Sequence, residues 1–239
     1  MKAAHSDPNA GPARAPLAAI WAVLAAVLLA AGPARPALAA GAAEELVEES
    51  RFSIERMLVD DELPELKGYV TRARGLLIIP QLVKGGFIVG AEAGSGVLMV
   101  RGDDGSWSAP VFVTLVAASI GLQIGGKSSK VLFAVMHDAA LDALLSNKVK
   151  LGVDLGVAVA HVGAGLEAST TTAARGDIFQ FAVSQGLFGG GALEGAVIEP
   201  RTSWNDAYYG RTLGAKAIVA DPNLASPGAD ALRTALDRR

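Results

Sequence analysis

Hydrophobic and polar positions follow two different periods along the chain, and the change between them lies near residue 68. Between residues 42 and 67, hydrophobic side chains recur every three or four positions and carboxylates fill most of the others, which predicts an amphipathic helix. Pro64 fits the first turn of a short second helix or a break between two helices. We expect the long helix to pack on its own domain. The alternative is a membrane-surface element, but such helices are usually rich in Lys and Arg, and this one is acidic.

Beyond residue 68 the chain consists of runs rich in β-branched residues and punctuated by glycine, which is typical of strands and turns. These runs occupy residues 75–80, 85–102, 106–126 and 130–137. Asp104 and Gly105 lie between two of the hydrophobic runs and indicate a β-hairpin. Residues 138–146 predict a short helix with Asp138 as its cap.

Residues 148–165 alternate strictly between bulky and small side chains, and we expect one strand there. One of its faces is almost bare, so another layer or an apolar ligand could lie close to the sheet. Two more strands are expected within residues 177–200, where five glycines between 184 and 200 mark the places where the strands bend, and a helix with a polar tail ends the chain.

Short antiparallel strands joined by brief helices, without a βαβ rhythm, define the expected fold class. We predict an α+β fold with a curved or barrel-like antiparallel β-sheet that is rich in glycine. An N-terminal amphipathic helix and a few short helices complete it.

The first forty residues form a separate segment. Lys2 and Arg14 precede an apolar run at residues 17–31, and Ala37 and Ala39 follow with the spacing of a signal peptidase site. We expect a signal peptide at residues 1–40, cleaved after Ala39 or Ala40, and a periplasmic or secreted protein. An uncleaved membrane anchor is the alternative, although fifteen apolar residues are short for crossing about 30 Å of hydrocarbon. The predicted domain then covers residues 41–215, followed by a C-terminal helix and tail at 216–239.

Composition limits the possible partners. The 239 residues are 51% hydrophobic, enough for one sizeable core, and the net charge of −3 gives no general attraction to nucleic acid. The chain has no cysteine, which excludes disulfides and the cysteine-linked lipid of a bacterial lipoprotein.

Residues for catalysis are few. No serine lies in a Gly-x-Ser-x-Gly motif, and beyond the leader only His137 and His161 carry an imidazole, at a spacing that fits no compact zinc motif. The glycine string at 163–168 is followed by a polar loop and not by the helix that a dinucleotide site requires. We predict no enzyme activity, no metal and no cofactor.

One charge asymmetry suggests a binding surface. Six cations flank the acidic helix and the apolar strands: Lys67, Arg72, Arg74, Lys84, Lys127 and Lys130. Together they would form a basic surface beside hydrophobic strands, which suits a phospholipid head group and its chains. The alternative is that they are scattered solubilising charges.

Several segments, in order and spacing, resemble the SYLF domain family. These segments are residues 73–113, residues 119–137, "SQGLFGGGALEGAVI" at 184–198 and "NDAYYG" at 205–210. The similarity covers roughly residues 45–210. The resemblance implies phospholipid binding, with phosphoinositides as ligands and, in some cases, actin as a partner of the eukaryotic members. It also implies that the N-terminal helix contributes to membrane contact, whereas the helix of this chain is acidic.

We therefore expect a non-enzymatic domain of the bacterial cell envelope that binds anionic phospholipid, a membrane surface or another amphiphile. A structural or protein-interaction module of the envelope without a lipid ligand is the alternative. An enzyme is a distant third hypothesis, and nucleic acid is not expected as a partner.

Overall fold

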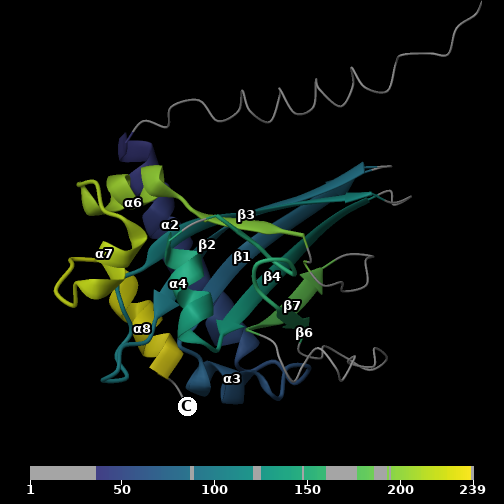
Figure 1. Ribbon diagram of the computed structural model, residues 1–239, viewed down its shortest axis with the longest axis horizontal. Coiled ribbons are helices and arrows are strands. Elements are labelled where there is room, and N and C mark those ends of the chain that lie inside the picture. Colours follow the sequence, from purple (N-terminus) through teal and green to yellow (C-terminus); the bar gives the residue numbers. More distant parts are fainter. Residues whose placement is uncertain are drawn as a thin grey trace, which may run out of the picture. The chain divides into compact units, whose positions relative to one another are not determined.

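One curved, eight-stranded β-sheet organises the molecule (Figure 1). The computed structural model describes residues 36–86, 89–120, 125–146, 148–159, 177–185, 193 and 195–237. The strands are β1 (Gly75–Gly86), β2 (Val89–Val100), β3 (Val111–Ile120), β4 (Gly125–Val135), β5 (Val149–Lys150), β6 (Val157–Val159), β7 (Ile178–Gln185) and β8 (Val197–Pro200). Their order across the sheet is β5-β8-β3-β2-β1-β4-β7-β6. Neighbouring strands are antiparallel except β6 and β7, which are parallel. The predicted fold class is confirmed.

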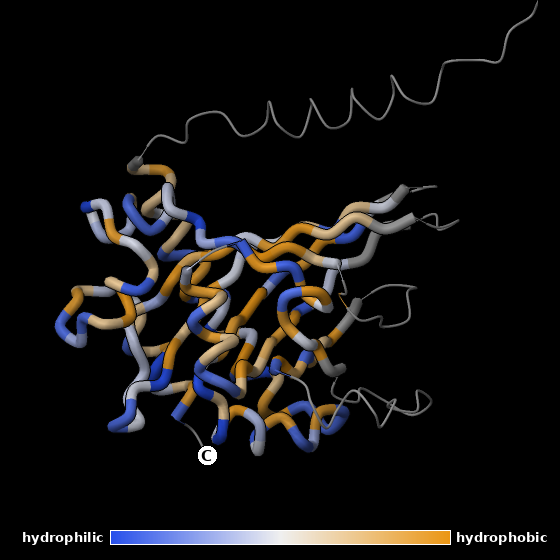
Figure 2. The backbone as a smooth tube through the Cα atoms, in the orientation of Figure 1, coloured by the Kyte–Doolittle hydropathy of each residue, from blue (hydrophilic) through white to orange (hydrophobic). Residues whose placement is uncertain are grey.

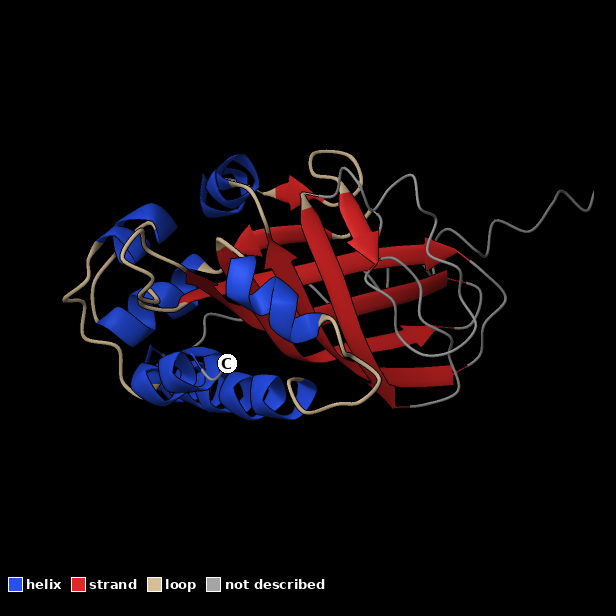
Figure 3. Cartoon of the chain, turned by 90° about the horizontal axis from the view of Figure 1, so that it is seen from below, coloured by secondary structure: helices blue, strands red, loops and turns tan. Residues whose placement is uncertain are grey.

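Helices cover only part of this sheet. They are α2 (Pro36–Met57), α3 (Leu66–Arg72), α4 (Asp138–Ser146), α6 (Thr202–Tyr209), α7 (Ala215–Ala220) and α8 (Ala229–Asp237). Figure 3 shows them gathered over one part of the strands, while the strands continue beyond them. The sequence analysis did not predict α6 and α7 as helices.

Alternate residues of β1 enter two different hydrophobic cores, because successive side chains of a strand point to opposite faces. Leu76 and Ile78 pack with α2, α3, α6 and α8. Leu77 and Ile79 pack on the opposite face with α4, α7 and the strands β5 and β8. The sheet is therefore the middle layer of three where the helices cover it.

The acidic N-terminal helix is a packing element of the domain. Its hydrophobic stripe, which includes Val47, Ile54 and Met57, is buried against the sheet. The helix ends at Met57, and α3 begins two residues after Pro64. Pro64 therefore lies in the break between two helices and not in the first turn of the second. The expectation that this helix packs on its own domain is confirmed.

Strand β1 changes register in its middle, at Pro80. The pairing moves from Ile78 opposite Val97 to Gln81 opposite Ser95. Such a bulge accommodates a proline, which has no N–H to donate to the ladder. Because the bulge adds one residue, Gln81 and Val83 point to the same face of the sheet as Leu76 and Ile78. The bulge therefore determines which side chains lie beyond the edge of α2.

The predicted hairpin turn is confirmed. Gly105 has a φ of 85°, and the Asp104 carboxylate accepts hydrogen bonds from the Ser106 amide at 2.9 Å and its hydroxyl at 2.7 Å. The helix expected at 138–146 also forms, and it begins at Asp138.

The single strand expected over residues 148–165 is wrong. β5 ends at Lys150, and the chain turns at Gly152, which has a φ of 79° and donates its N–H to the Leu155 carbonyl at 2.8 Å. Alternation does not distinguish a strand from a turn that returns only some of the alternate side chains to the core. Leu151 and Leu155 are buried, whereas Val153 is 71% exposed. The continuation past residue 159, and residues 186–192 of the glycine-rich stretch, lie outside the described residues.

Candidate functional site

A groove of about 540 Å³ lies between the first half of α2 and the sheet. We call it the α2 groove, and its lining residues are Ala42, Glu45, Leu46, Glu49, Gln81, Val83, Ala93, Gly94, Ser95, Thr114, Arg201 and Trp204. The volume lies within the range of about 300–1,000 Å³ that is common for small-molecule sites. Helix, strand and loop residues thus converge on one concave surface.

Arg201 is the cation of the α2 groove. It follows β8 directly, and its main-chain N–H donates to the Phe112 carbonyl at 2.8 Å. Its guanidinium donates to the Ser95 hydroxyl on β2 at 2.8 Å and lies 3.9 Å from the ring centroid of Trp204. The backbone and the stacked ring together fix the position of this guanidinium.

The charge of Arg201 is only partly compensated. Burial lowers the pKa of its guanidinium, although an arginine stays protonated at any physiological pH. Within the described part of the chain, no carboxylate forms an ion pair with it. The guanidinium therefore retains donors for an anionic group that enters the groove.

Two carboxylates of α2 line the same groove. Glu45 and Glu49 are one helical turn apart, so they lie on one face of the helix. Both are exposed, and neither pairs with a cation among the residues described. The groove thus offers both signs of charge.

An apolar sheet surface begins inside the groove, where Val83 and Ala93 belong to the lining, and continues beyond it at Val116. Val83 on β1 and Val116 on β3 are 49% and 42% exposed, and Ala93 on β2 is exposed between them. Figure 2 shows hydrophobic residues along the strands that project beyond the helices. We call Val83, Ala93 and Val116 the open face. The open face lies next to the polar side chains of the groove lining.

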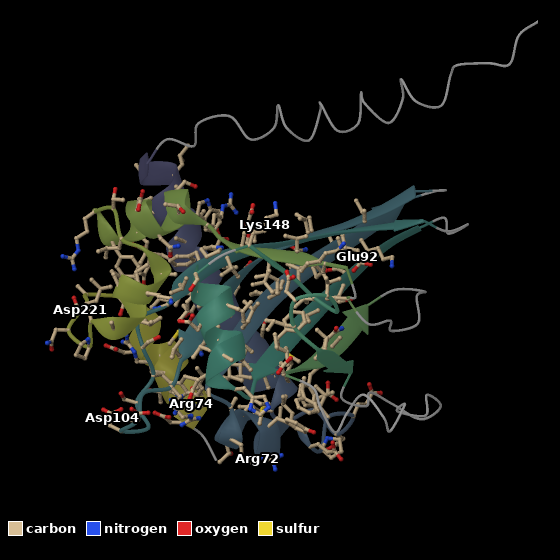
Figure 4. All side chains as sticks on the ribbon, in the orientation of Figure 1. Arg72, Arg74, Glu92, Asp104, Lys148 and Asp221 are labelled. Carbon is tan, nitrogen blue, oxygen red and sulfur yellow. The ribbon has the colours of Figure 1, made fainter. Side chains whose placement is uncertain are left out.

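Three of the predicted cations lie near the start of β1, two lie near its far end, and Lys130 lies beside its middle, since its neighbours on β4 pair with Ile79 and Leu82. Lys67 and Arg72 belong to α3, and Arg74 immediately precedes β1. The guanidinium of Arg74 donates to Asp138 at 2.6 Å and to Asp103 at 3.1 Å, and the bond to Asp138 is the main cause of its raised pKa. Figure 4 shows Arg72 and Arg74 at one end of the molecule and Glu92 at the other.

Lys84 and Lys127 lie near the projecting end of the strands. Lys84 forms an ion pair with Glu92 on β2 at 2.6 Å. Lys127 is the β4 residue opposite Lys84, and its side chain lies outside the described residues, whereas Lys130 is half-buried. Lys84 lies ten positions after Arg74 along β1, on the order of 30 Å. The structure does not bring the six cations together, and their role in binding lipid stays a prediction.

Of the two histidines beyond the leader, the structure describes His137. The main-chain carbonyl of His137 accepts the N–H of Leu141 at 3.1 Å in the first turn of α4, and His161 lies outside the described residues. The part of the chain that the structure describes holds no cluster of three or more metal-ligating side chains. Within that part, no helix is long and apolar enough to cross a membrane.

Sequence reasoning missed Arg201, Glu45 and Glu49 as site residues. The spacing of Arg201 and Trp204 was the one local signal, since residues three apart on a helix can stack. The contact with Ser95, which is 106 positions away, is a product of the sheet order.

Comparison with known proteins finds a family model and several curated relatives that are similar to this chain. A family model described as "Ysc84: Las17-binding protein actin regulator" matches residues 116–239. "SH3 domain-containing YSC84-like protein 1" of Homo sapiens is 32% identical over 151 residues, which are 63% of this chain and 44% of that protein. "LAS seventeen-binding protein 3" of Saccharomyces cerevisiae is 33% identical over 171 residues, 70% of this chain and 37% of the relative. The chain spans less than half the length of these curated relatives.

Proposed function

The chain belongs to the SYLF (Ysc84) family, and from that premise we propose that it is a non-enzymatic domain that binds a phospholipid through the α2 groove. The polar head group enters the groove, and the acyl chains lie along the open face. This assignment keeps the ligand class expected from the sequence and changes the residues that bind it.

Arg201 is the observation that carries the proposal. Its guanidinium is partly buried, oriented by Ser95 and Trp204, and without a described carboxylate partner. An arginine held in this way costs free energy unless an anionic oxygen shares its charge. A phosphate provides such oxygens in a geometry that fits the planar guanidinium.

The open face favours a phospholipid as the ligand and not a small polar phosphate compound. Val83, Ala93 and Val116 expose apolar surface on three adjacent strands. Burial of that surface by methylene groups contributes roughly 25 cal/mol per Å². A polar metabolite would leave it in water.

The proposal is tested by titrating the full chain with dihexanoyl-phosphatidylethanolamine or dihexanoyl-phosphatidylglycerol, whose short chains keep the lipid soluble. Trp204 lines the groove, so its fluorescence reports occupancy, and the Trp204→Phe variant identifies its share of the signal. We expect saturable binding of at least one lipid, and a loss of about tenfold or more in affinity in Arg201→Gln, because a charge-assisted contact is removed.

Arg211→Gln is the matched control, since it makes the same change at an exposed residue that pairs with Asp221 outside the groove. Arg201→Lys keeps the positive charge. Lipid affinity that is retained in this variant but lost in Arg201→Gln shows that the charge, and not a folding defect, causes the loss. Equal affinity in the wild type and in a folded Arg201→Gln variant would refute the groove as the site.

A protein partner is the second candidate, and the names of the relatives favour it. "LAS seventeen-binding protein 3" is named for a protein partner. The exposed apolar side chains of the open face would contribute to such an interface. Purified Las17 mixed with this chain, with and without Val116→Asp, tests this candidate by size-exclusion chromatography. Co-elution that is lost in the variant would support it.

We also propose that the domain acts in the bacterial envelope after export, a proposal based on the apolar run and the Ala-x-Ala spacing of the leader. Both predicted cleavage sites lie within the first turns of α2, where Ala39 is buried. Cleavage would leave every residue of the groove lining in place, since the lining begins at Ala42. The intact mass of the protein from a periplasmic extract tests this: a start at Ala40 or Gly41 supports export, and an uncut chain in the membrane fraction supports the anchor.

A further inference from the structure

We infer that the α2 groove selects a head group that carries a primary ammonium as well as a phosphate, so that its ligand is an ethanolamine phospholipid. This inference rests on the proposed function and specifies its ligand. It differs from the sequence-based expectation of an anionic lipid.

The charge of the groove is the first argument. Its lining contains one cation, Arg201, and two carboxylates, Glu45 and Glu49, which gives a net charge of −1. A head group with only negative charge would gain from Arg201 but would be opposed by both carboxylates. A head group with a phosphate and an ammonium is attracted by both sides of the groove.

The placement of these charges is the second argument. Glu45 and Glu49 come from successive turns of α2. Arg201 follows β8, and its guanidinium contacts Ser95 of β2 and Trp204 of α6. The two signs are thus carried by different elements of one concave surface. They do not neutralise each other, because no ion pair joins these three side chains. A ligand that spans them can pair with each.

The chemistry of the lining distinguishes a primary from a quaternary ammonium. A primary ammonium has three N–H donors, and carboxylates accept them directly. A quaternary ammonium has no N–H donor and is usually held by aromatic faces. Trp204 is the one aromatic residue of the lining, and the Arg201 guanidinium already stacks on it. The groove therefore suits ethanolamine better than choline.

The test measures the affinity of the full chain for a series of dihexanoyl lipids with ethanolamine, choline or glycerol attached to the phosphate. Trp204 fluorescence is the readout. We expect the ethanolamine lipid to bind about tenfold or more tightly than the glycerol lipid, from the added charge-assisted contacts. Choline should be intermediate.

The decisive variant is Glu45→Gln with Glu49→Gln, which removes the negative side of the groove and keeps its shape. We expect the preference for ethanolamine over glycerol to disappear or reverse, while the glycerol lipid binds at least as tightly as before. The matched control is Glu62→Gln with Glu65→Gln, two exposed carboxylates outside the groove lining. That control should keep the preference.

The possible failures are distinguishable. If the glycerol lipid binds as tightly as the ethanolamine lipid in the wild type, the selection of an ammonium is refuted and the proposed function stands. If glycerophosphoethanolamine, which has no acyl chains, binds as tightly as the dihexanoyl lipid, the ligand is a soluble head group and the assignment to a membrane lipid is refuted. If no lipid binds, the proposed function fails together with the inference.

Discussion

The side chain of Asn205 pairs with both main-chain polar groups of Phe112. Its carbonyl oxygen accepts the Phe112 N–H at 2.9 Å, and its amide donates to the Phe112 carbonyl at 3.3 Å. The named ladder between β3 and β8 starts at Val113 opposite Pro200. The Phe112 carbonyl still accepts the main-chain N–H of Arg201 at 2.8 Å, whereas the Phe112 N–H is paired with the Asn205 side chain. Asn205 belongs to the "NDAYYG" segment, and this pair of bonds gives the segment a structural role.

We expect Asn205→Ala to lower the free energy of unfolding by about 2–4 kcal/mol. The change leaves the Phe112 N–H buried and unpaired and opens a small cavity, since Asn205 is only 1% exposed. Urea denaturation measures the effect. Asn223→Ala, at an exposed position, should change the stability by less than about 0.5 kcal/mol. A similar loss in both variants would contradict the role assigned to Asn205.

Gly94 lies where the β1 bulge leaves no room for a side chain. A Cβ at this position would lie 2.8 Å from the Gln81 carbonyl oxygen and 2.8 Å from a methyl group of Ile79. Gly94→Ala should therefore destabilise the protein by about 1–3 kcal/mol through overpacking. Gly85→Ala on β1 is the control, because a Cβ there meets nothing within 4 Å. Thermal unfolding of the two variants compares them, and equal stability would refute the close approach at the bulge.

Tyr208, which is buried, and Tyr209, which is half-buried, make the stability depend on alkaline pH. Burial raises the pKa of Tyr208 and of Tyr209, and a second contribution comes from the charge of Glu44 on Tyr208 and from Tyr208 on Tyr209. The folded state thus holds these protons more tightly than the unfolded state, whose tyrosines titrate near pH 10. Their contribution is fully present below pH 10 and is lost as the pH rises above it.

The Tyr208→Phe, Tyr209→Phe double variant tests this linkage. Between pH 9 and 11.5 the free energy of unfolding of the wild type should fall more steeply than that of the variant. The difference should reach up to about 1.4 kcal/mol per pH unit for each tyrosine. The variant also loses the hydrogen bonds to the Pro227 and Pro110 carbonyls, so the comparison rests on the slopes. Parallel slopes would contradict the prediction.

Reversing the charges of α3 tests which of two candidate surfaces binds lipid, the predicted basic surface or the α2 groove. Lys67 and Arg72 lie near the start of β1, whereas Gln81 and Val83 line the groove on the order of 25 Å further along the strand. We expect Lys67→Glu with Arg72→Glu to leave the affinity for a soluble short-chain phospholipid within about twofold, because charges at that distance are largely screened. A tenfold loss would restore these cations as the binding surface.

Local pattern determined much of the fold. The helical period of residues 42–57 placed α2 and its buried face, and Asp104 and Gly105 specified the hairpin. These features depend on neighbours in the sequence, so propensity and periodicity are sufficient to predict them. The alternation beyond Lys150 was equally clear, but the turn at Gly152 formed where the pattern indicated a strand. The turn buries Leu151 and Leu155 as a strand would, but it exposes Val153 between them.

The site was decided by the tertiary structure alone. Sequence proximity suggested that Arg74 is a free cation, but Asp138, 64 positions later, and Asp103 bind it across the sheet. Conversely, Arg201 became the cation of the α2 groove because the strand order brings it to Ser95 and because α2 covers only part of the sheet. The sequence by itself determined most of the elements, the family and the ligand class that we expect, but not α6, α7 or the turn at Gly152. The pairing of distant charges, and therefore which cations remain for a ligand, was set by the order of the strands and the bulge at Pro80, since electrostatic pairing depends on distance in space and not along the chain.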